Sequence, residues 1–323
     1  MKVLVTGGAG YIGSVVAQQL LAYGHQVVIL DNLSSGHADT AVPGAQFVDA
    51  PLSEAHRVLS TGDGESPFDA VIHLAAKSLV GESVEFPERY WHGNIVATLQ
   101  LIDAMRSAGV PRIVFSSTAA VYGNPAAGLP DGLITEDHPT SPINPYGASK
   151  LAIDHMLAAE ARAHGLAAVS LRYFNVGGAS GSLRERHDPE THLIPNLLKV
   201  ITGERPHAEL YGVDYPTADG TAIRDYIHVL DLAQAHLLAM EWIEPGVHEV
   251  FNLGTGVGTS VRSVIAAVEE HTGGELPVVE RPRRPGDPAH LVASGEKARA
   301  TLGWEPQHDI HAIVRDAAAG LTG

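Results

Sequence analysis

Hydrophobic and polar residues alternate along the first half of the chain in a pattern that predicts strands followed by helices. Short apolar runs ended by polar or glycine residues predict strands over 2–6, 26–30, 70–74, 112–116 and 167–172. Apolar positions at helical spacing predict helices over 11–22, 94–105 and 146–164. This alternation is typical of the α/β class, with a Rossmann-type, doubly wound parallel sheet covered by helices on both faces.

The alternation weakens after about residue 174, where glycine, proline and histidine become frequent. We therefore expect the doubly wound domain over residues 1–174 and a smaller C-terminal α/β domain over residues 175–323. Residues 225–241 are predicted to be helical and residues 250–254 to form a strand. Because both segments are core-like, we expect residues 225–256 to return to the first domain.

Composition and charge narrow the classes of protein to which the chain can belong. Its 323 residues carry a formal net charge of −16, which argues against nucleic acid as a partner. The sequence contains no cysteine, which excludes disulfides, thiolate metal sites and cysteine nucleophiles. We find neither a signal-peptide pattern nor an apolar run of the roughly 18 residues that a membrane span requires. We therefore expect a cytoplasmic protein with no membrane partner.

Three glycines follow the first predicted strand and open the first predicted helix. Gly7, Gly10 and Gly13 suit a tight turn, a close approach of the backbone to a pyrophosphate, and close packing of the helix on the sheet. Asp31 ends the next predicted strand, where a carboxylate can accept hydrogen bonds from an adenosine ribose. The alternative is a solvated loop acid. Together these residues predict a dinucleotide site that prefers NAD to NADP, whose 2′-phosphate an aspartate would repel.

A second motif supplies groups for proton transfer. Tyr146 and Lys150 are four residues apart, so a helix would place both on one face. The lysine ammonium can favour the tyrosine phenolate, which can then remove a proton from a substrate hydroxyl. Ser116 and Thr118 end an earlier strand and could orient that hydroxyl. The alternatives are a surface helix start, and hydroxyl groups that bond only to local backbone.

The chain resembles the extended short-chain dehydrogenase/reductase family over almost its whole length and, within that family, the epimerases that act at carbon 4 of UDP-hexoses. The motifs that carry the resemblance are VLVTGGAGYIG (3–13), LDNLSSG (30–36), VIHLAAKSLVGES (71–83), FSSTAAVYG (115–123), SPINPYGASK (141–150), LRYFNVGGAS (171–180), RDYIHVLDL (224–232), FNLGTGVG (251–258) and RRPGD (283–287).

The resemblance implies a reaction: transient oxidation of the sugar at carbon 4, rotation of the 4-keto intermediate, and reduction on its other face, which interconverts UDP-glucose and UDP-galactose. Thr118 is followed by alanines, whereas the related dehydratases place an acid pair there. A UDP-hexuronate or UDP-pentose epimerase remains an alternative. A non-catalytic NAD-sensing protein is a further alternative, although Tyr146 and Lys150 are both present.

The resemblance also implies the residues of the site. The implied catalytic residues are Tyr146, Lys150 and Thr118. The implied NAD-binding residues are Gly7, Gly10, Tyr11, Ile12, Gly13, Asp31, Asn32, Leu52, Leu74, Ala75, Ala76, Ser78, Asn94, Ser116, Tyr146, Lys150, Tyr173 and Phe174. The implied UDP-sugar-binding residues are Thr118, Tyr146, Asn175, His192, Tyr211, Arg224, Arg284, Asp287 and Leu291.

Three further expectations concern the substrate range, metals and assembly. Leu291 stands where a large tyrosine would exclude N-acetyl groups, so the resemblance implies that UDP-N-acetylated sugars are also accepted; the alternative is an alignment shifted by one residue, which places His290 there. His187 and His192 flank a proline that breaks any helix able to align them, so we expect no metal site. The stretches 94–106 and 148–160 have apolar residues beyond one face, and family members pair these helices as homodimers.

Overall fold

The computed structural model describes residues 1–323 except 41, 61–67, 126–131, 285–286 and 322–323. Its centre is a seven-stranded sheet in the order β12-β6-β5-β4-β1-β2-β3, in which every neighbouring pair is parallel. The strands are β1 (Lys2–Thr6), β2 (Gln26–Asp31), β3 (Gln46–Asp49), β4 (Ala70–His73), β5 (Arg112–Ser116), β6 (Ala167–Tyr173) and β12 (His248–Leu253). The predicted doubly wound α/β fold is confirmed.

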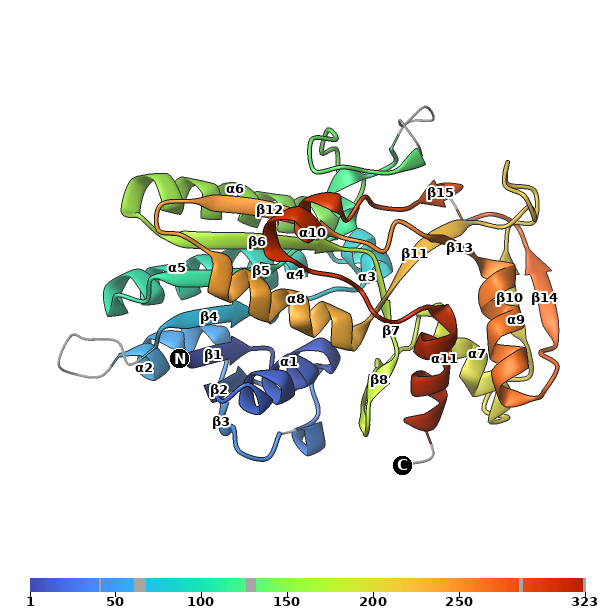
Figure 1. Cartoon of the computed structure of the whole chain (residues 1–323), viewed down its shortest axis with the longest axis horizontal. Coiled ribbons are helices and arrows are strands. Elements are labelled where there is room, and N and C mark those ends of the chain that lie inside the picture. Colours follow the sequence, from blue (N-terminus) through green and yellow to red (C-terminus); the bar gives the residue numbers. More distant parts are fainter. Residues whose placement is uncertain (41, 61–67, 126–131, 285–286, 322–323) are drawn as a thin grey trace.

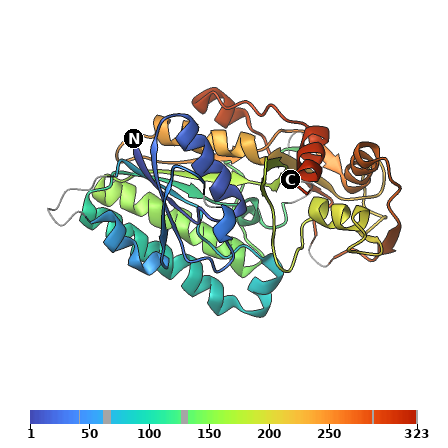
Figure 2. The same cartoon turned by 90° about the horizontal axis from the view of Figure 1, so that it is seen from below.

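Helices cover both faces of this sheet, as Figures 1 and 2 show. Alternate residues of β1 point to opposite faces: Val3 and Val5 belong to one apolar core and Leu4 to the other. The first core includes α1 (Tyr11–Ala22) and α8 (Val229–Trp242). The second includes α2 (Ala55–Leu59), α5 (Ala97–Ala108) and α6 (Pro145–His164).

Short helical segments link these elements. They are 3-10 turns at Ala38–Thr40, Leu52–Glu54 and Ala119–Tyr122, the helices α3 (Val80–Glu85) and α4 (Pro87–Tyr90), and a π-helix at Trp91–Val96 that runs into α5. The predicted helix over 94–105 is thus two kinds of helix in sequence. A π-turn is wider than an α-turn, so it changes which residues face the sheet.

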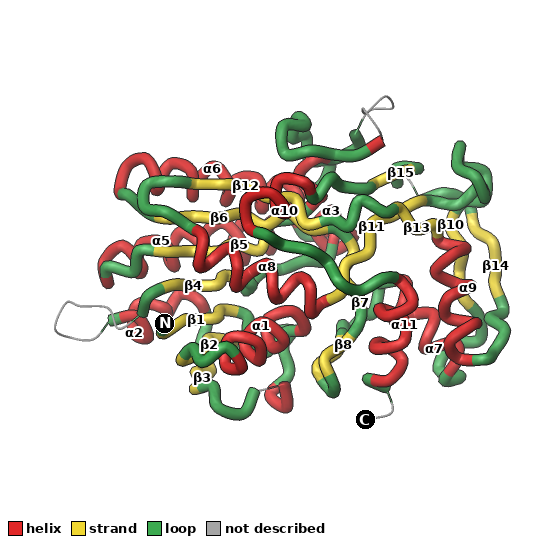
Figure 3. Tube along the Cα trace, viewed as in Figure 1, coloured by secondary structure: helices red, strands yellow, loops and turns green. Residues whose placement is uncertain are grey.

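The remaining elements form a smaller lobe beside the carboxyl ends of the central strands (Figure 3). Its apolar core joins α7 (Leu193–Ile201), α9 (Val261–Thr272) and α11 (Ile310–Ala319). Its strands are β7 (Asn175–Gly177), β8 (Ala179–Ser180), β9 (Leu183–Arg184), β10 (Ala208–Tyr211), β11 (Ile223–His228), β13 (Gly258–Ser260), β14 (Val278–Arg281) and β15 (His290–Leu291). Helix α10 (Glu296–Leu302) contacts β12 and α8 of the first lobe.

The helix predicted over 225–241 is wrong at its start. Residues 225–228 complete β11, where Tyr226 to His228 pair with β7 and all four residues are buried. A strand buried on both faces has no regular polar alternation, and the sequence Asp-Tyr-Ile-His leads without a break into the apolar start of α8, so it reads as a continuation of the helix. Helix α8 begins at Val229 and contacts α1, and β12 joins the sheet beside β6.

Among the residues that the structure describes, no helix combines the length and the apolar character needed to span a bilayer.

Candidate active site

A cavity of about 1260 Å³ opens at the carboxyl ends of the central strands and continues beneath the smaller lobe. It lies where the strand order reverses, because β1 continues to β2 and β3 on one side and β4 to β6 follow on the other. Ligands of open α/β sheets bind in this crevice. The topology of the sheet therefore sets the position of the cavity.

The glycine-rich turn after β1 forms the floor of the cavity. Gly7 has a φ of 73°, and a Cβ atom there would lie 2.6 Å from the backbone nitrogen of Ala75. A Cβ atom at Gly13 would lie 2.1 Å from the carbonyl oxygen of Gly7, so only glycine lets α1 approach the turn. No side chain caps α1 at Gly10, and its first turn contains no acidic residue. The helix N-terminus is thus available to an anion such as a pyrophosphate.

Asp31 stands at the rim of the cavity, at the end of β2. Its two carboxylate oxygens accept backbone N–H groups, Oδ2 from Ala9 at 3.0 Å and Oδ1 from Leu33 at 2.8 Å. These bonds fix the carboxylate while each oxygen keeps capacity for a further hydrogen bond. The arrangement fits a ribose diol better than a phosphate. Together with the glycine turn, it makes the residues present suitable for NAD.

Lys150 lies buried on α6 beneath the cavity. Its ammonium donates a hydrogen bond to the carbonyl oxygen of Ser116 at 2.7 Å and lies 4.7 Å from the centre of the Phe115 ring. The centre of the Tyr146 ring is 6.0 Å from the same nitrogen, so the helix brings both members of the motif together. Burial lowers the pKa of Lys150 to about 7, although the carboxylate of Asp154 opposes this shift.

The state of Tyr146 differs from the one that the sequence led us to expect. Burial raises the pKa of the Tyr146 phenol, and a hydrogen bond with the Thr118 side chain only partly offsets the rise. The expected stabilisation of the phenolate by Lys150 stays a prediction, because burial and Thr118 are the causes that set the direction here. The physical reason is that burial penalises both charged forms, the phenolate and the ammonium.

Supporting side chains hold this pair in place from β5 and β6. The hydroxyl groups of Ser116 and Tyr173 are hydrogen-bonded to each other at the edge of the cavity. One helical turn beyond Lys150, Asp154 forms a buried ion pair with Arg172 at 2.9 Å. Arg172 also donates to the Tyr122 hydroxyl at 3.0 Å. The network anchors α6 to the sheet and fixes the position from which Lys150 projects.

The smaller lobe contributes cationic and aromatic side chains to the far wall. Arg224 on β11 is buried and paired with the carboxylate of Asp287. The guanidinium of Arg284 lies 4.0 Å from the centre of the Tyr211 ring. Guanidinium groups of this kind bind phosphate oxygens through paired hydrogen bonds. This wall can therefore hold a nucleoside diphosphate opposite the catalytic pair.

Twenty-four of the predicted site residues line this one cavity: Gly7, Gly10, Tyr11, Ile12, Gly13, Asp31, Asn32, Leu52, Leu74, Ala75, Ala76, Ser78, Ser116, Thr118, Tyr146, Lys150, Tyr173, Phe174, Asn175, His192, Tyr211, Arg224, Arg284 and Asp287. They come from both lobes, and the fold brings them together from segments far apart in the sequence.

Two predicted residues lie outside the lining. Asn94 is buried in the π-helix, where its amide bonds the main chain of Lys77 and the Ser149 hydroxyl, and Gly93 faces the cavity instead. Its assignment to the cofactor stays a prediction. Leu291 lies in β15 and packs in a small apolar cluster with Phe174. Its role as a gate stays a prediction.

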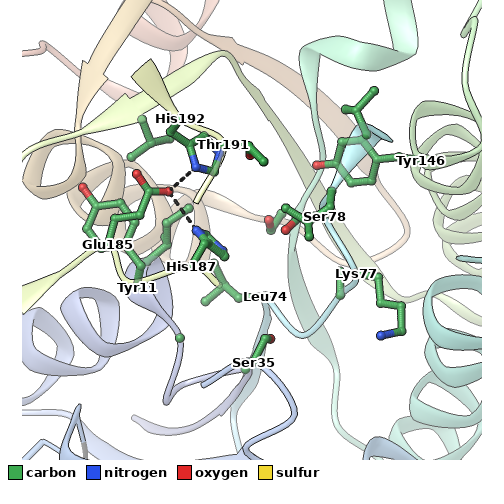
Figure 4. A pocket seen from close by; sticks show the side chains of 18 of the residues that line it. Tyr11, Ser35, Leu74, Lys77, Ser78, Tyr146, Glu185, His187, Thr191 and His192 are labelled. Atoms are coloured by element: carbon green, nitrogen blue, oxygen red, sulfur yellow. Dashed lines mark hydrogen bonds and ion pairs between the residues drawn. The ribbon is translucent and has the colours of Figure 1, made fainter. Parts of the chain in front are cut away.

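Some lining residues were missed from the sequence. Tyr226 lines the cavity, and its hydroxyl is hydrogen-bonded to the Asn175 side chain. Glu185 and His187 line it too, next to His192 (Figure 4). Burial lowers the pKa of His192, but hydrogen bonds to Glu185 and Glu190 outweigh this effect and raise it to about 10. Only the His187–His192 spacing gave a signal in the sequence.

Comparison with known proteins agrees with this architecture. The model of the NAD dependent epimerase/dehydratase family matches residues 3–254. The chain belongs to this family. The UDP-glucose 4-epimerase of Corynebacterium glutamicum is 54% identical over 319 residues, which cover 98% of this chain and 94% of that one.

Solved structures of the same family superpose on the whole chain. A UDP-glucose 4-epimerase from Brucella ovis in complex with NAD has a TM-score of 0.92 at 45% identity and covers 98% of this chain and 97% of its own. One from Bifidobacterium longum in complex with NAD+ and UDP has a TM-score of 0.90 at 38% identity, with 100% and 98% covered. The resemblance found in the sequence is confirmed.

Proposed function

We propose that the chain interconverts UDP-glucose and UDP-galactose by reversible, NAD-dependent oxidation at carbon 4 of the sugar. One observation carries the proposal. A Tyr146–Lys150 pair and a glycine-rich anion site line the same cavity, which continues to the Arg224 wall of the smaller lobe. A reaction at one sugar carbon needs these elements and no further acid or base.

The residues around the sugar have distinct roles in this reaction. The phenolate oxygen of Tyr146 takes the proton of the 4-hydroxyl. It returns this proton after the 4-keto sugar has rotated and its other face has been reduced. Thr118 bonds the same phenol and orients it. The chemistry that bound NAD supplies is reversible acceptance of hydride from carbon 4, together with a positive charge that favours the Tyr146 phenolate. No net oxidation results, so the protein needs no second redox partner.

The two lobes hold different parts of the ligands. The turn at Gly7 to Gly13 and the carboxylate of Asp31 suit the pyrophosphate and adenosine ribose of NAD. Arg224 and Arg284 suit the diphosphate of the UDP-sugar. A nucleotide anchored at this wall leaves its sugar free to turn within the cavity, as epimerisation requires.

Product analysis tests the proposal. The purified protein is incubated with UDP-galactose, with and without added NAD, and the nucleotide sugars are separated by chromatography. We expect conversion to UDP-glucose, and for Tyr146→Phe a loss of at least about 100-fold because the proton acceptor is gone. Absence of conversion by a protein shown to bind NAD would contradict the proposal. Parallel incubation with UDP-N-acetylgalactosamine tests the prediction for Leu291.

We further propose that the protein works as a cytoplasmic homodimer. Apolar side chains are exposed on neighbouring helical segments, including Val84 at 65%, Leu99 at 45% and Val96 at 41%. They lie on α3, α5 and the π-helix that joins α4 to α5. Exposed apolar groups gathered on adjoining helices favour burial against a second copy.

Light scattering during size exclusion tests the assembly. We expect two chains per particle for the wild type and one for a Val96→Glu, Leu99→Glu variant. Val257 is 67% exposed in the smaller lobe, so Val257→Glu is a matched control that should leave two chains per particle. A dimer that survives the double substitution would place the interface elsewhere.

A further inference from the structure

Four side chains of the metal-ligating types meet at the wall of the cavity, where three of them line it and Glu190 lies behind them. Glu185, His187, Glu190 and His192 each offer one ligand atom, and these four atoms all lie within 4.8 Å of one another. His192 Nδ1 is 3.0 Å from the Glu185 carboxylate and 2.9 Å from that of Glu190, and His187 Nδ1 is 3.1 Å from that of Glu185. Figure 4 shows both imidazoles turned toward Glu185. A loop aligns these residues, so the helix-breaking proline does not keep the histidines apart.

Charge and burial distinguish this cluster from an ordinary surface group. The side chains of Glu185 and Glu190 are only 9% and 2% exposed. Neither carboxylate has a lysine or arginine ion-pair partner within the part of the chain that the structure describes. Arg186, which follows Glu185 in the sequence, instead pairs with Asp39 at 2.6 Å. Two buried carboxylates therefore have only the imidazoles of His187 and His192 as ion-pair partners, a place that a divalent cation can also fill.

We propose that Glu185, His187, Glu190 and His192 form a binding site for one divalent transition-metal ion of the zinc type. Two neutral imidazoles and two carboxylates around a divalent cation carry no net charge, so the ion can replace the imidazole protons as the counter-charge of the carboxylates. Donors bound about 2.0–2.2 Å from zinc lie roughly 3 Å or slightly more from one another, and three donor pairs of the cluster are already 2.9–3.1 Å apart. Mixed nitrogen and oxygen ligands favour zinc over magnesium or calcium, which prefer oxygen alone.

Hydrogen bonds already hold part of this ligand set in place. The backbone N–H groups of Thr191 and His192 each donate to the Glu190 carboxylate at 2.8 Å. Outer hydrogen bonds of this kind orient the carboxylates of metal sites. The imidazoles of His187 and His192 are 28% and 45% exposed, so an ion can enter from the cavity. A bound ion would tie the 185–192 loop to the start of α7 and so fix the wall beside Thr191.

Metal titration of tag-free protein tests the site. The protein is dialysed against EDTA, freed of chelator and titrated with Zn²⁺ by calorimetry. We expect one ion per chain, with affinity at least about 100-fold weaker in His187→Gln and Glu185→Gln, since loss of an outer partner alone costs about 10–100-fold. His311→Gln is the matched control, because His311 pairs with Glu270 on the surface at 3.6 Å, away from this cluster. Wild-type affinity is expected there.

A second measurement makes the test independent of the variants. X-ray absorption on the wild type loaded with one equivalent of Zn²⁺ should show imidazole nitrogen together with oxygen in the first coordination shell. No saturable binding, binding that His187→Gln leaves unchanged, or a shell without imidazole would overturn the proposal. The site does not depend on the proposed epimerase reaction, so product analysis and metal titration can fail separately.

Discussion

Replacing Lys150 by methionine should stabilise the protein while it abolishes turnover. Burial lowers the pKa of Lys150 from 10.5 to about 7. At neutral pH the unfolded chain has a hydrated ammonium here, so folding must either remove its proton or bury its charge. The depressed pKa corresponds to a cost of about 4 kcal/mol at pH 7. Methionine has no charge to bury, but it leaves the carbonyl of Ser116 without its donor, which costs about 1–3 kcal/mol. A net gain of roughly 1–3 kcal/mol remains.

The sign of the pH dependence follows from proton counting. Between about pH 7 and pH 10.5 the unfolded chain binds more protons at this residue than the folded chain does. The stability of the wild type therefore rises with pH in this window relative to the variant, by up to about 1.4 kcal/mol per pH unit. The advantage of Lys150→Met should shrink by roughly 2 kcal/mol between pH 7 and pH 9. Below pH 7 the difference should be constant.

Urea unfolding of nucleotide-free protein at several pH values measures this difference. Lys199→Met, on α7 and away from the catalytic helix, is the control and should show no comparable trend with pH. Turnover of UDP-galactose, measured on the same preparations, should be lost only in Lys150→Met. A Lys150→Met protein that is less stable than the wild type at pH 7, or a difference that does not change with pH, would refute the reasoning.

Three further predictions follow from the geometry. Gly13→Ala should lower stability by about 1–3 kcal/mol and abolish NAD binding, because its Cβ would strike the turn backbone. A Cβ at Gly81 meets nothing within 4 Å, so Gly81→Ala should be tolerated. Calorimetry measures NAD binding and urea unfolding measures stability for the two variants. Arg224→Ala should raise KM for UDP-galactose at least about tenfold through loss of a charged hydrogen bond, whereas Arg262→Ala, which breaks an exposed pair, should not change it. Leu291→Tyr should lower the turnover of UDP-N-acetylgalactosamine more than that of UDP-galactose in competition assays.

Much of the fold could be predicted because its signals are local. A short apolar strand, a glycine turn and a helix are adjacent in the sequence, and the parallel sheet follows from their repetition. Gly13 is a clear case, since its requirement comes from the turn only a few residues before it. The cavity was predictable for the same reason, because a doubly wound sheet has its crevice where the strand order reverses.

The parts that could not be predicted depend on contacts between distant segments or on irregular helices. Residues 225–228 form a strand because β7 pairs with them, and nothing in their own pattern indicates that partner. Asn94 turns away from the cavity because it sits in a π-helix, for which the sequence has no simple signal. The Glu185 cluster depends on the path of a loop, and spacing rules based on helices cannot describe such a path.

Burial acts against the charged forms of both catalytic side chains, and this has a functional consequence. It raises the pKa of Tyr146 and lowers that of Lys150 to about 7. A positive charge that enters the cavity lowers the free energy of the Tyr146 phenolate. The base is therefore favoured when the cofactor that accepts hydride is bound. A protein without its cofactor would then have little capacity to remove a proton from a bound sugar. The same burial that destabilises Lys150 thus couples proton transfer at Tyr146 to cofactor binding, and the pH dependence of the stability of Lys150→Met reports the strength of that burial.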